Sequence, residues 1–137
     1  MTAPPVDCPV DIIFVVDEST SIRRRNFDKV KTFLSKLIGR LDIDSGKTRV
    51  GLVTFSTRVG HSVNLTMHMS VDSLQMEIMS LRYGKGTTNT AAALRHVRTR
   101  MLTPAAGDRP NVPNVVVVLT DGDSNSQSAT RVSLMIL

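Results

Sequence analysis

Two short apolar runs constrain the fold of this chain more than any other feature of its sequence. Residues 10–16 read Val-Asp-Ile-Ile-Phe-Val-Val, and residues 115–119 are four valines followed by a leucine. Strands with apolar residues at consecutive positions are typical of the centre of a parallel sheet, where helices cover both faces. Both runs are therefore predicted to be buried central strands of an α/β fold.

Segments of helical and of strand character alternate with these runs. Apolar residues recur at helical spacing in three segments, residues 27–39, 71–81 and 91–103. Residues 49–55 and 59–63 predict two strands that form an antiparallel hairpin at an edge of the sheet. This alternation predicts a doubly wound, mostly parallel sheet flanked by helices.

The length of the chain fits a single domain. It has 137 residues, of which 41% are hydrophobic, enough for one globular core but not for two. We expect an N-terminal extension over residues 1–9 and one domain over residues 10–137. Residues 127–137 are predicted to begin a further helix, and their apolar end predicts a domain that is incomplete at its C-terminus. The strand at residues 115–119 is therefore expected to be an unpaired sheet edge.

Charge and composition narrow the classes of partner. The chain has 17 Lys and Arg against 12 Asp and Glu, a net charge of +5 that favours an acidic partner. Residues 23–25 are three arginines, although such a run is more often a solvated helix start. The aromatic residues lie mostly at core spacings, which leaves no stacking platform for nucleic acid. No apolar run approaches the roughly 18 residues that a membrane span needs.

Polar residues gather where the predicted strands end. Residues 17–21 read Asp-Glu-Ser-Thr-Ser directly after the first apolar run, and residues 120–122 read Thr-Asp-Gly after the last one. Residues 86–90, Gly-Thr-Thr-Asn-Thr, open the helix predicted from residue 91. Because ligands of open α/β sheets bind at the carboxyl ends of the strands, we expect these three loops to meet on one rim.

The donors in these loops are oxygens, with no histidine or thiol among them, and oxygen donors favour a hard cation such as Mg²⁺ or Mn²⁺. Asp17 and Asp121 would balance a 2+ ion, and Ser19, Ser21 and a threonine would be neutral donors. Such a set leaves room for a carboxylate from outside the chain.

These three segments resemble the metal-ion-dependent adhesion site (MIDAS) of von Willebrand factor type A (VWA) domains. The match rests on Asp17-x-Ser19-x-Ser21, Thr88-Asn89-Thr90 and Thr120-Asp121-Gly122, and residues 49–56 are similar to a strand of matrilins and collagen VI-like proteins. The resemblance covers residues 8–137 and implies a Rossmann-like fold. It also implies that Ser19, Ser21 and Thr88 offer hydroxyls to the metal, with Asp17 and Asp121 acting directly or through water. Thr87 competes with Thr88 as the donor, and the Thr-Asn-Thr match favours Thr88.

The same resemblance implies a place and a partner. Members of this kind are extracellular, bind matrix or cell-surface proteins through an acidic side chain at the metal, and carry out no turnover. The sequence Asn64-Leu65-Thr66 is a candidate N-glycosylation site, which fits a secreted protein. Cys8 matches a position that pairs, in many extracellular members, with a later cysteine that this chain lacks. The family's sheet also continues with two strands and a helix beyond the point where this chain ends.

Two alternative functions would use the same metal site for a different purpose. In a Mg²⁺-dependent phosphoryl-transfer hydrolase Asp17 would be the nucleophile, but Ser19 stands where such hydrolases commonly have a second aspartate. An intracellular VWA subunit of a larger complex would share the site but not the features at Cys8 and Asn64. Glu18 adjoins the motif and is expected to be a solvated loop acid.

Overall fold

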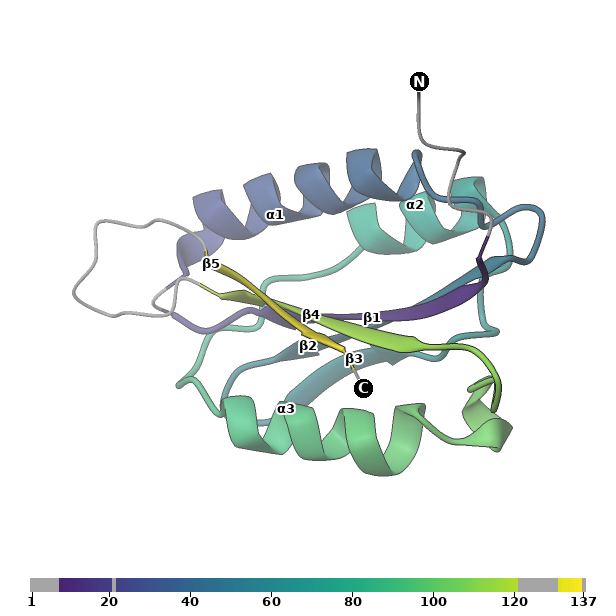
Figure 1. Cartoon of the computed structure of the whole chain (residues 1–137). Helices are drawn as coiled ribbons and strands as arrows, with labels where there is room; N and C mark the ends of the chain where they lie inside the picture. Colours follow the sequence, from purple (N-terminus) through teal and green to yellow (C-terminus); the bar gives the residue numbers. More distant parts are fainter. Residues whose placement is uncertain (1–7, 21, 121–130, 137) are drawn as a thin grey trace, which may run out of the picture.

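The computed structural model describes residues 8–20, 22–120 and 131–136, which form one five-stranded sheet with helices on both faces (Figure 1). The strands are β1 (Val10–Asp17), β2 (Thr48–Phe55), β3 (Val59–Val63), β4 (Asn114–Thr120) and β5 (Arg131–Ile136). Their spatial order is β3-β2-β1-β4-β5. The central strand β1 runs parallel to β2 and β4, while β3 and β5 pair antiparallel at the two edges. The predicted α/β architecture and the edge hairpin of β2 and β3 are confirmed.

Helices cover the sheet in two layers. The helices α1 (Arg23–Ile38) and α2 (Val71–Met79) lie on one face, and α3 (Thr90–His96) lies on the other (Figure 1). A π-helical segment, η1 (Val97–Met101), prolongs α3, and a short 3₁₀ turn, η2 (Pro104–Ala106), follows it. These positions agree with the three segments of helical spacing in the sequence.

The apolar run of β1 is consecutive because both of its faces are buried. Phe14 and Val16 belong to the core under α1 and α2, whereas Ile13 and Val15 belong to the core under α3 and η1. Side chains alternate between the faces of a strand, so a strand between two helical layers needs apolar residues at every position. The carboxyl end of this strand therefore emerges between the two layers.

The C-terminal segment differs from the sequence prediction. Residues 131–136 form strand β5 rather than a helix, and β5 pairs along β4 from Thr120↔Arg131 to Val115↔Ile136. Four of the six residues are apolar, at 132, 134, 135 and 136, and those at 132, 134 and 136 recur with the period of two that suits a strand. The expected helix is wrong over these residues, and so is the expectation that β4 is an unpaired edge. The rest of the segment predicted as helical, residues 127–130 and 137, lies outside the described residues.

No helix within the described ranges is long and apolar enough to cross a membrane.

Candidate metal centre

The loops after β1 and before α3 meet at the carboxyl ends of the parallel strands, as the sequence predicted, together with the turn after β2. Of the third predicted loop, residues 120–122, only Thr120 belongs to the described residues. The loop after β1 is joined to β2 by a hydrogen bond from Glu18 N to the carbonyl of Phe55 (2.8 Å), and to the loop before α3 by one from Thr20 N to the carbonyl of Gly86 (2.8 Å). A third, from Asn89 N to the carbonyl of Ser56 (2.9 Å), ties that loop to the turn after β2. Residues distant in sequence are thereby held on one rim.

Asp17 is fully buried at the tip of β1, and its carboxylate is held at both oxygens. Oδ1 accepts a hydrogen bond from the backbone N–H of Ser19 (2.8 Å), and Oδ2 accepts one from the Thr120 hydroxyl (2.7 Å). Ser19 is itself buried, at 1% exposure. The carboxylate therefore has a fixed orientation, set by its own loop on one side and by the end of β4 on the other.

The two competing threonines have different surroundings. The hydroxyl of Thr87 lies 2.9 Å from the hydroxyl of Thr57, which also accepts a hydrogen bond from Thr87 N (3.0 Å). Thr88 is exposed. Asn89 caps α3 by accepting a hydrogen bond from Ala92 N (3.1 Å), which fixes the end of the loop.

Two of the predicted metal ligands, Ser21 and Asp121, lie outside the described residues. Within the part of the chain that the structure describes, no three His, Cys, Asp or Glu side chains cluster so as to hold a metal. The described donors are one carboxylate, Asp17, with the hydroxyls of Ser19 and Thr88. Such a set suits a hard cation completed by further oxygens rather than a softer one held by imidazole or thiolate.

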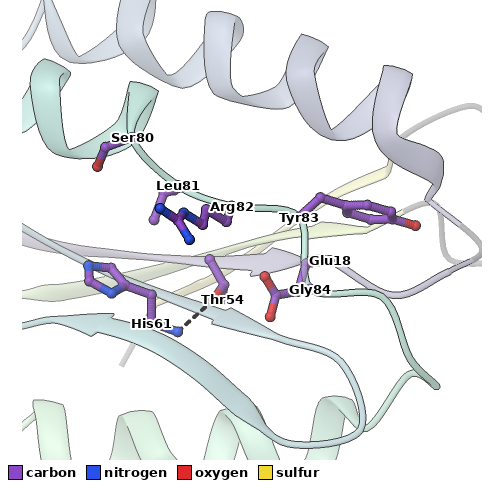
Figure 2. Close-up of a pocket in the computed structure, with 8 residues that line it drawn as sticks. All are labelled: Glu18, Thr54, His61, Ser80, Leu81, Arg82, Tyr83 and Gly84. Carbon is purple, nitrogen blue, oxygen red and sulfur yellow. Dashed lines mark hydrogen bonds between the residues drawn. The ribbon is translucent and has the colours of Figure 1, made fainter.

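Glu18 is buried, contrary to the sequence expectation of a solvated loop acid. It is 6% exposed, lines a cavity of about 330 Å³, and continues the alternation of Phe14 and Val16 toward the α1–α2 face (Figure 2). A Cβ atom at Gly60 would lie 2.6 Å from Glu18 Oε1, and one at Gly84 would lie 2.5 Å from it. The missing signal was the pair of glycines, distant in sequence, that make room for this carboxylate.

The Glu18 carboxylate joins three segments. It lines one cavity with Thr54 on β2 and with Gly84, and the space left by Gly60 and Gly84 receives its Oε1 atom. Burial raises the pKa of Glu18 above its ordinary value of 4.5, and the nearby Thr54 side chain and Gly84 backbone oppose that rise. Because Gly84 lies in the segment that leads to Thr88, Glu18 helps to hold the threonine loop against the strands.

Tyr83, which the sequence analysis did not single out, makes a second contact that holds the same loop. Its hydroxyl donates to the carbonyl of Ser19 (2.8 Å), and its ring lies 5.5 Å from that of Phe27. Thr20 Oγ1 accepts a hydrogen bond from Gly86 N (3.0 Å). The loop that carries Thr88 is thus fastened to the loop that carries Ser19.

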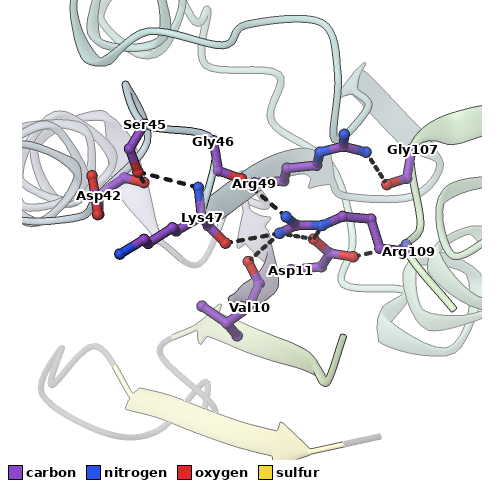
Figure 3. A network of polar contacts seen from close by, with 9 residues as sticks. All are labelled: Val10, Asp11, Asp42, Ser45, Gly46, Lys47, Arg49, Gly107 and Arg109. Carbon is purple, nitrogen blue, oxygen red and sulfur yellow. Dashed lines mark hydrogen bonds and ion pairs between the residues drawn. The ribbon is translucent and has the colours of Figure 1, made fainter. Parts of the chain in front are cut away.

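A buried ion pair closes the opposite ends of the strands (Figure 3). The guanidinium of Arg109 contacts the fully buried Asp11 at 2.7 Å and donates to the carbonyls of Val10, Gly46 and Lys47. The amino ends of β1 and β2 are therefore tied to the loop before β4. The candidate metal ligands therefore lie at the end of β1 opposite to this ion pair.

Asn64 and Cys8, which the sequence analysis related to an extracellular location, are distant in sequence from the metal loops. Asn64 is half-buried, and its Oδ1 accepts hydrogen bonds from the backbone N–H (3.0 Å) and the hydroxyl (3.1 Å) of Thr66. Cys8 is an exposed free thiol just before β1.

Comparison with known proteins identifies relatives over nearly the whole chain. The family model of the von Willebrand factor type A domain matches residues 11–136. The collagen alpha-4(VI) chain of Mus musculus is 39% identical over 121 residues, 87% of this chain and 5% of that one. Matrilin-1 of Bos taurus is 39% identical over 117 residues, 83% of this chain and 22% of that one. The chain thus spans a small part of the length of these relatives, which are extracellular matrix proteins and not enzymes.

A solved structure shares the fold. Proximal thread matrix protein 1 from the mussel byssus superposes with a TM-score of 0.78 at 28% identity, covering 88% of this chain and 32% of that one. Another structure of that protein, described as having a zinc-occupied MIDAS motif, has a TM-score of 0.74 at 26% identity, covering 88% of this chain and 31% of that one. A metal-occupied MIDAS motif is therefore known in a protein of the same fold.

Proposed function

The chain belongs to the family of von Willebrand factor type A domains, and from that premise we propose that it is a metal-dependent protein-binding module. One observation carries the proposal. A fully buried carboxylate, Asp17, is held at both oxygens at the strand ends, next to the buried Ser19 and on the rim that the Thr88 loop completes. Such a carboxylate is preorganised for a cation that enters from the rim.

The proposed metal is Mg²⁺ or Mn²⁺, held by Asp17, Ser19, Ser21, Thr88 and Asp121. The hydroxyls would coordinate directly, and the carboxylates directly or through water. The pairing of Thr87 with Thr57 favours Thr88 over Thr87 as the threonine donor. When bound, the ion supplies positive charge and an open coordination position that a carboxylate of the partner fills.

The proposed partner is an extracellular matrix or cell-surface protein that offers Asp or Glu, and the proposed location is extracellular. The matrilin and collagen relatives support both. Glycosylation at Asn64 is part of this proposal, as is a module that extends over residues 10–137 after an extension of residues 1–9.

We propose no enzymatic turnover. The relatives are matrix proteins. In the alternative in which Asp17 attacks a phosphoryl group, Ser19 stands where such hydrolases commonly have a second aspartate.

Titration calorimetry with Mg²⁺ and Mn²⁺ tests the metal site. We expect saturable binding that Asp17→Ala abolishes, because loss of one carboxylate leaves the 2+ ion undercompensated. Asp42→Ala is the matched control, since Asp42 is an exposed acid at the other end of the strands. Equal binding by wild type and Asp17→Ala would refute the assignment.

A further inference from the structure

Exposed cations surround the proposed metal centre on three segments. We call this set the basic collar: Arg23 and Arg24 on the first turn of α1, Arg58 on the turn between β2 and β3, and Arg82 and Lys85 on the loop after α2. All five side chains belong to exposed residues. The collar is therefore open to solvent on segments that adjoin the loops of the proposed metal centre.

The hydrogen bonds of the rim bring these segments together. In the turn between β2 and β3, the carbonyl of Arg58 accepts a hydrogen bond from Ser56 N (2.9 Å). Thr57, which lies between these two residues, is hydrogen-bonded through its hydroxyl to Thr87 on the loop after α2. Arg24 and Arg82 line one groove of about 360 Å³ together with Tyr83, the residue that bonds to Ser19. The collar is thus continuous with the residues that carry the proposed metal ligands.

Among the described residues, the collar's positive charge is not paired with acids, although the exposed Asp28 lines the same groove as Arg24 and Arg82. None of its five members makes an ion pair with another residue that the structure describes. Asp17 and Glu18 are buried beneath it, and the exposed Asp28 lies 3.9 Å from Lys31, which is not a collar member. Residues 121–130 contribute two acids, one of them assigned to the metal.

We infer that the basic collar selects an acidic segment of a partner protein, in which one carboxylate binds the metal and neighbouring carboxylates bind Arg24, Arg58 and Arg82. This inference rests on the proposed function only for the contact between the partner's first carboxylate and the metal. Guanidinium groups match carboxylates in a planar, two-point geometry, so arginines suit this task. A partner with basic residues beside its acid is repelled.

The size of the effect follows from the exposure of the collar. Exposed ion pairs each contribute little to affinity. Their summed field accelerates association by about 10-fold or more, and salt removes that gain because the Debye length is only about 10 Å at 0.1 M. The association rate is therefore the quantity to measure.

The test uses two fluorescent peptides, an oligoglutamate and a serine-glycine peptide with a single glutamate, measured by stopped flow in Mg²⁺. The collar variant is Arg24→Gln/Arg58→Gln/Arg82→Gln. The matched control is Arg95→Gln/Arg98→Gln/Arg100→Gln, which removes the same charge from exposed residues of α3 and η1. We expect the oligoglutamate to associate about 10-fold more slowly with the collar variant at low salt, nearly normally with the control, and equally with all forms at about 1 M salt.

The outcomes separate this inference from the proposed function. Normal Mg²⁺ titration of the collar variant, together with slow peptide association, supports both. If no form binds Mg²⁺ but oligoglutamate binding in EDTA still requires the collar, the inference stands and the metal site fails. Equal slowing by the collar and control variants overturns the inference, because only net charge then matters. Tighter collar-dependent binding of a heparin oligosaccharide than of oligoglutamate also overturns it, in favour of a sulfated glycan.

Discussion

Asp17 and Glu18 are consecutive buried carboxylates whose surroundings differ because they point toward opposite faces of β1. Asp17 is oriented by Ser19 N and the Thr120 hydroxyl toward the proposed metal. Glu18 turns toward Thr54 and Gly84 and fastens the loop that leads to Thr88. One strand tip therefore carries a candidate ligand and, beside it, a residue that positions another candidate ligand.

Only part of this arrangement is visible in the sequence. Asp17 and Ser19 follow an apolar strand with a hydroxyl-rich spacing, so their place on the rim is predictable. Glu18 looks like any loop acid, because its burial depends on Gly60 and Gly84, which only the folded chain brings to it. Sequence spacing reports local geometry, not the space left by distant glycines.

A double-mutant cycle tests the close packing of Glu18 against Gly84. Gly84→Ala is expected to destabilise the domain by about 1–3 kcal/mol, because the added methyl group meets the Glu18 carboxylate. In a Glu18→Ala background the same change should cost much less, giving a coupling energy of about 0.5–3 kcal/mol. Urea denaturation of the four proteins measures it. Additive effects of the two substitutions would show that the carboxylate does not fill this space.

At the scale of elements, strand β5 shows how a short apolar segment can form a strand where a helix was predicted. The six residues 131–136 are apolar at 132, 134, 135 and 136, a pattern that fits a short strand as well as the start of a helix. β-strand pairing with β4 satisfies the backbone groups of a strand that was expected to be bare. Short apolar runs are ambiguous between helix and strand until a neighbouring strand is known.

The ion pair at the amino ends of the strands is predicted to affect the stability of the domain but not its affinity for metal. Asp11→Ala leaves the Arg109 guanidinium, whose side chain is only 20% exposed, without its carboxylate partner. We expect a loss of about 3 kcal/mol in the free energy of unfolding, because an unpaired charge stays largely buried. Urea denaturation measures the loss, and Mg²⁺ affinity should be unchanged because the pair lies at the far end of β1. A fall in Mg²⁺ affinity in a folded Asp11→Ala protein would contradict this separation of the two ends.

The contact between α3 and β3 predicts a pH dependence. Nε2 of His96 lies 3.0 Å from the Ser62 hydroxyl, and burial, followed by the nearby Arg100, lowers the pKa of His96 below 6.5. The unfolded chain then takes up the proton first, so stability is lost as the pH falls through about 6.5. Thermal unfolding should show a smaller loss on acidification in His96→Gln than in wild type. Ser62→Ala, which keeps the imidazole, should retain the wild-type loss, and identical pH profiles for wild type and His96→Gln would refute the assignment.

The whole molecule divides into a closed end and an open end. Alternation of apolar strands and amphipathic helices predicts this division, because a parallel sheet brings its carboxyl ends to one rim. Closure at the other end depends on Arg109, which sequence spacing did not single out. The basic collar likewise draws on three segments, of which only the arginine run at residues 23–25 is conspicuous in the sequence.

Metal binding at the open end should stabilise the whole domain. A ligand that binds only the folded state adds RT ln(1 + [L]/Kd), about 2.7 kcal/mol at a hundredfold excess over Kd. The proposed ligands come from loops after β1 and β4 and before α3, so they are brought together only in the folded chain. Mg²⁺ should therefore raise the Tm of wild type by several degrees at constant ionic strength, and EDTA should reverse the rise.

Variants show whether that rise comes from the proposed centre. Asp17→Ala should show no Mg²⁺-dependent rise in Tm, whereas Asp42→Ala should show the full one. The comparison is made within each protein, with and without metal, because removing a buried carboxylate also changes the stability of the metal-free chain. A rise that persists in Asp17→Ala would mean that the ion stabilises the fold from another place, and the rim at the ends of β1 and β4 would lose its role as the metal centre.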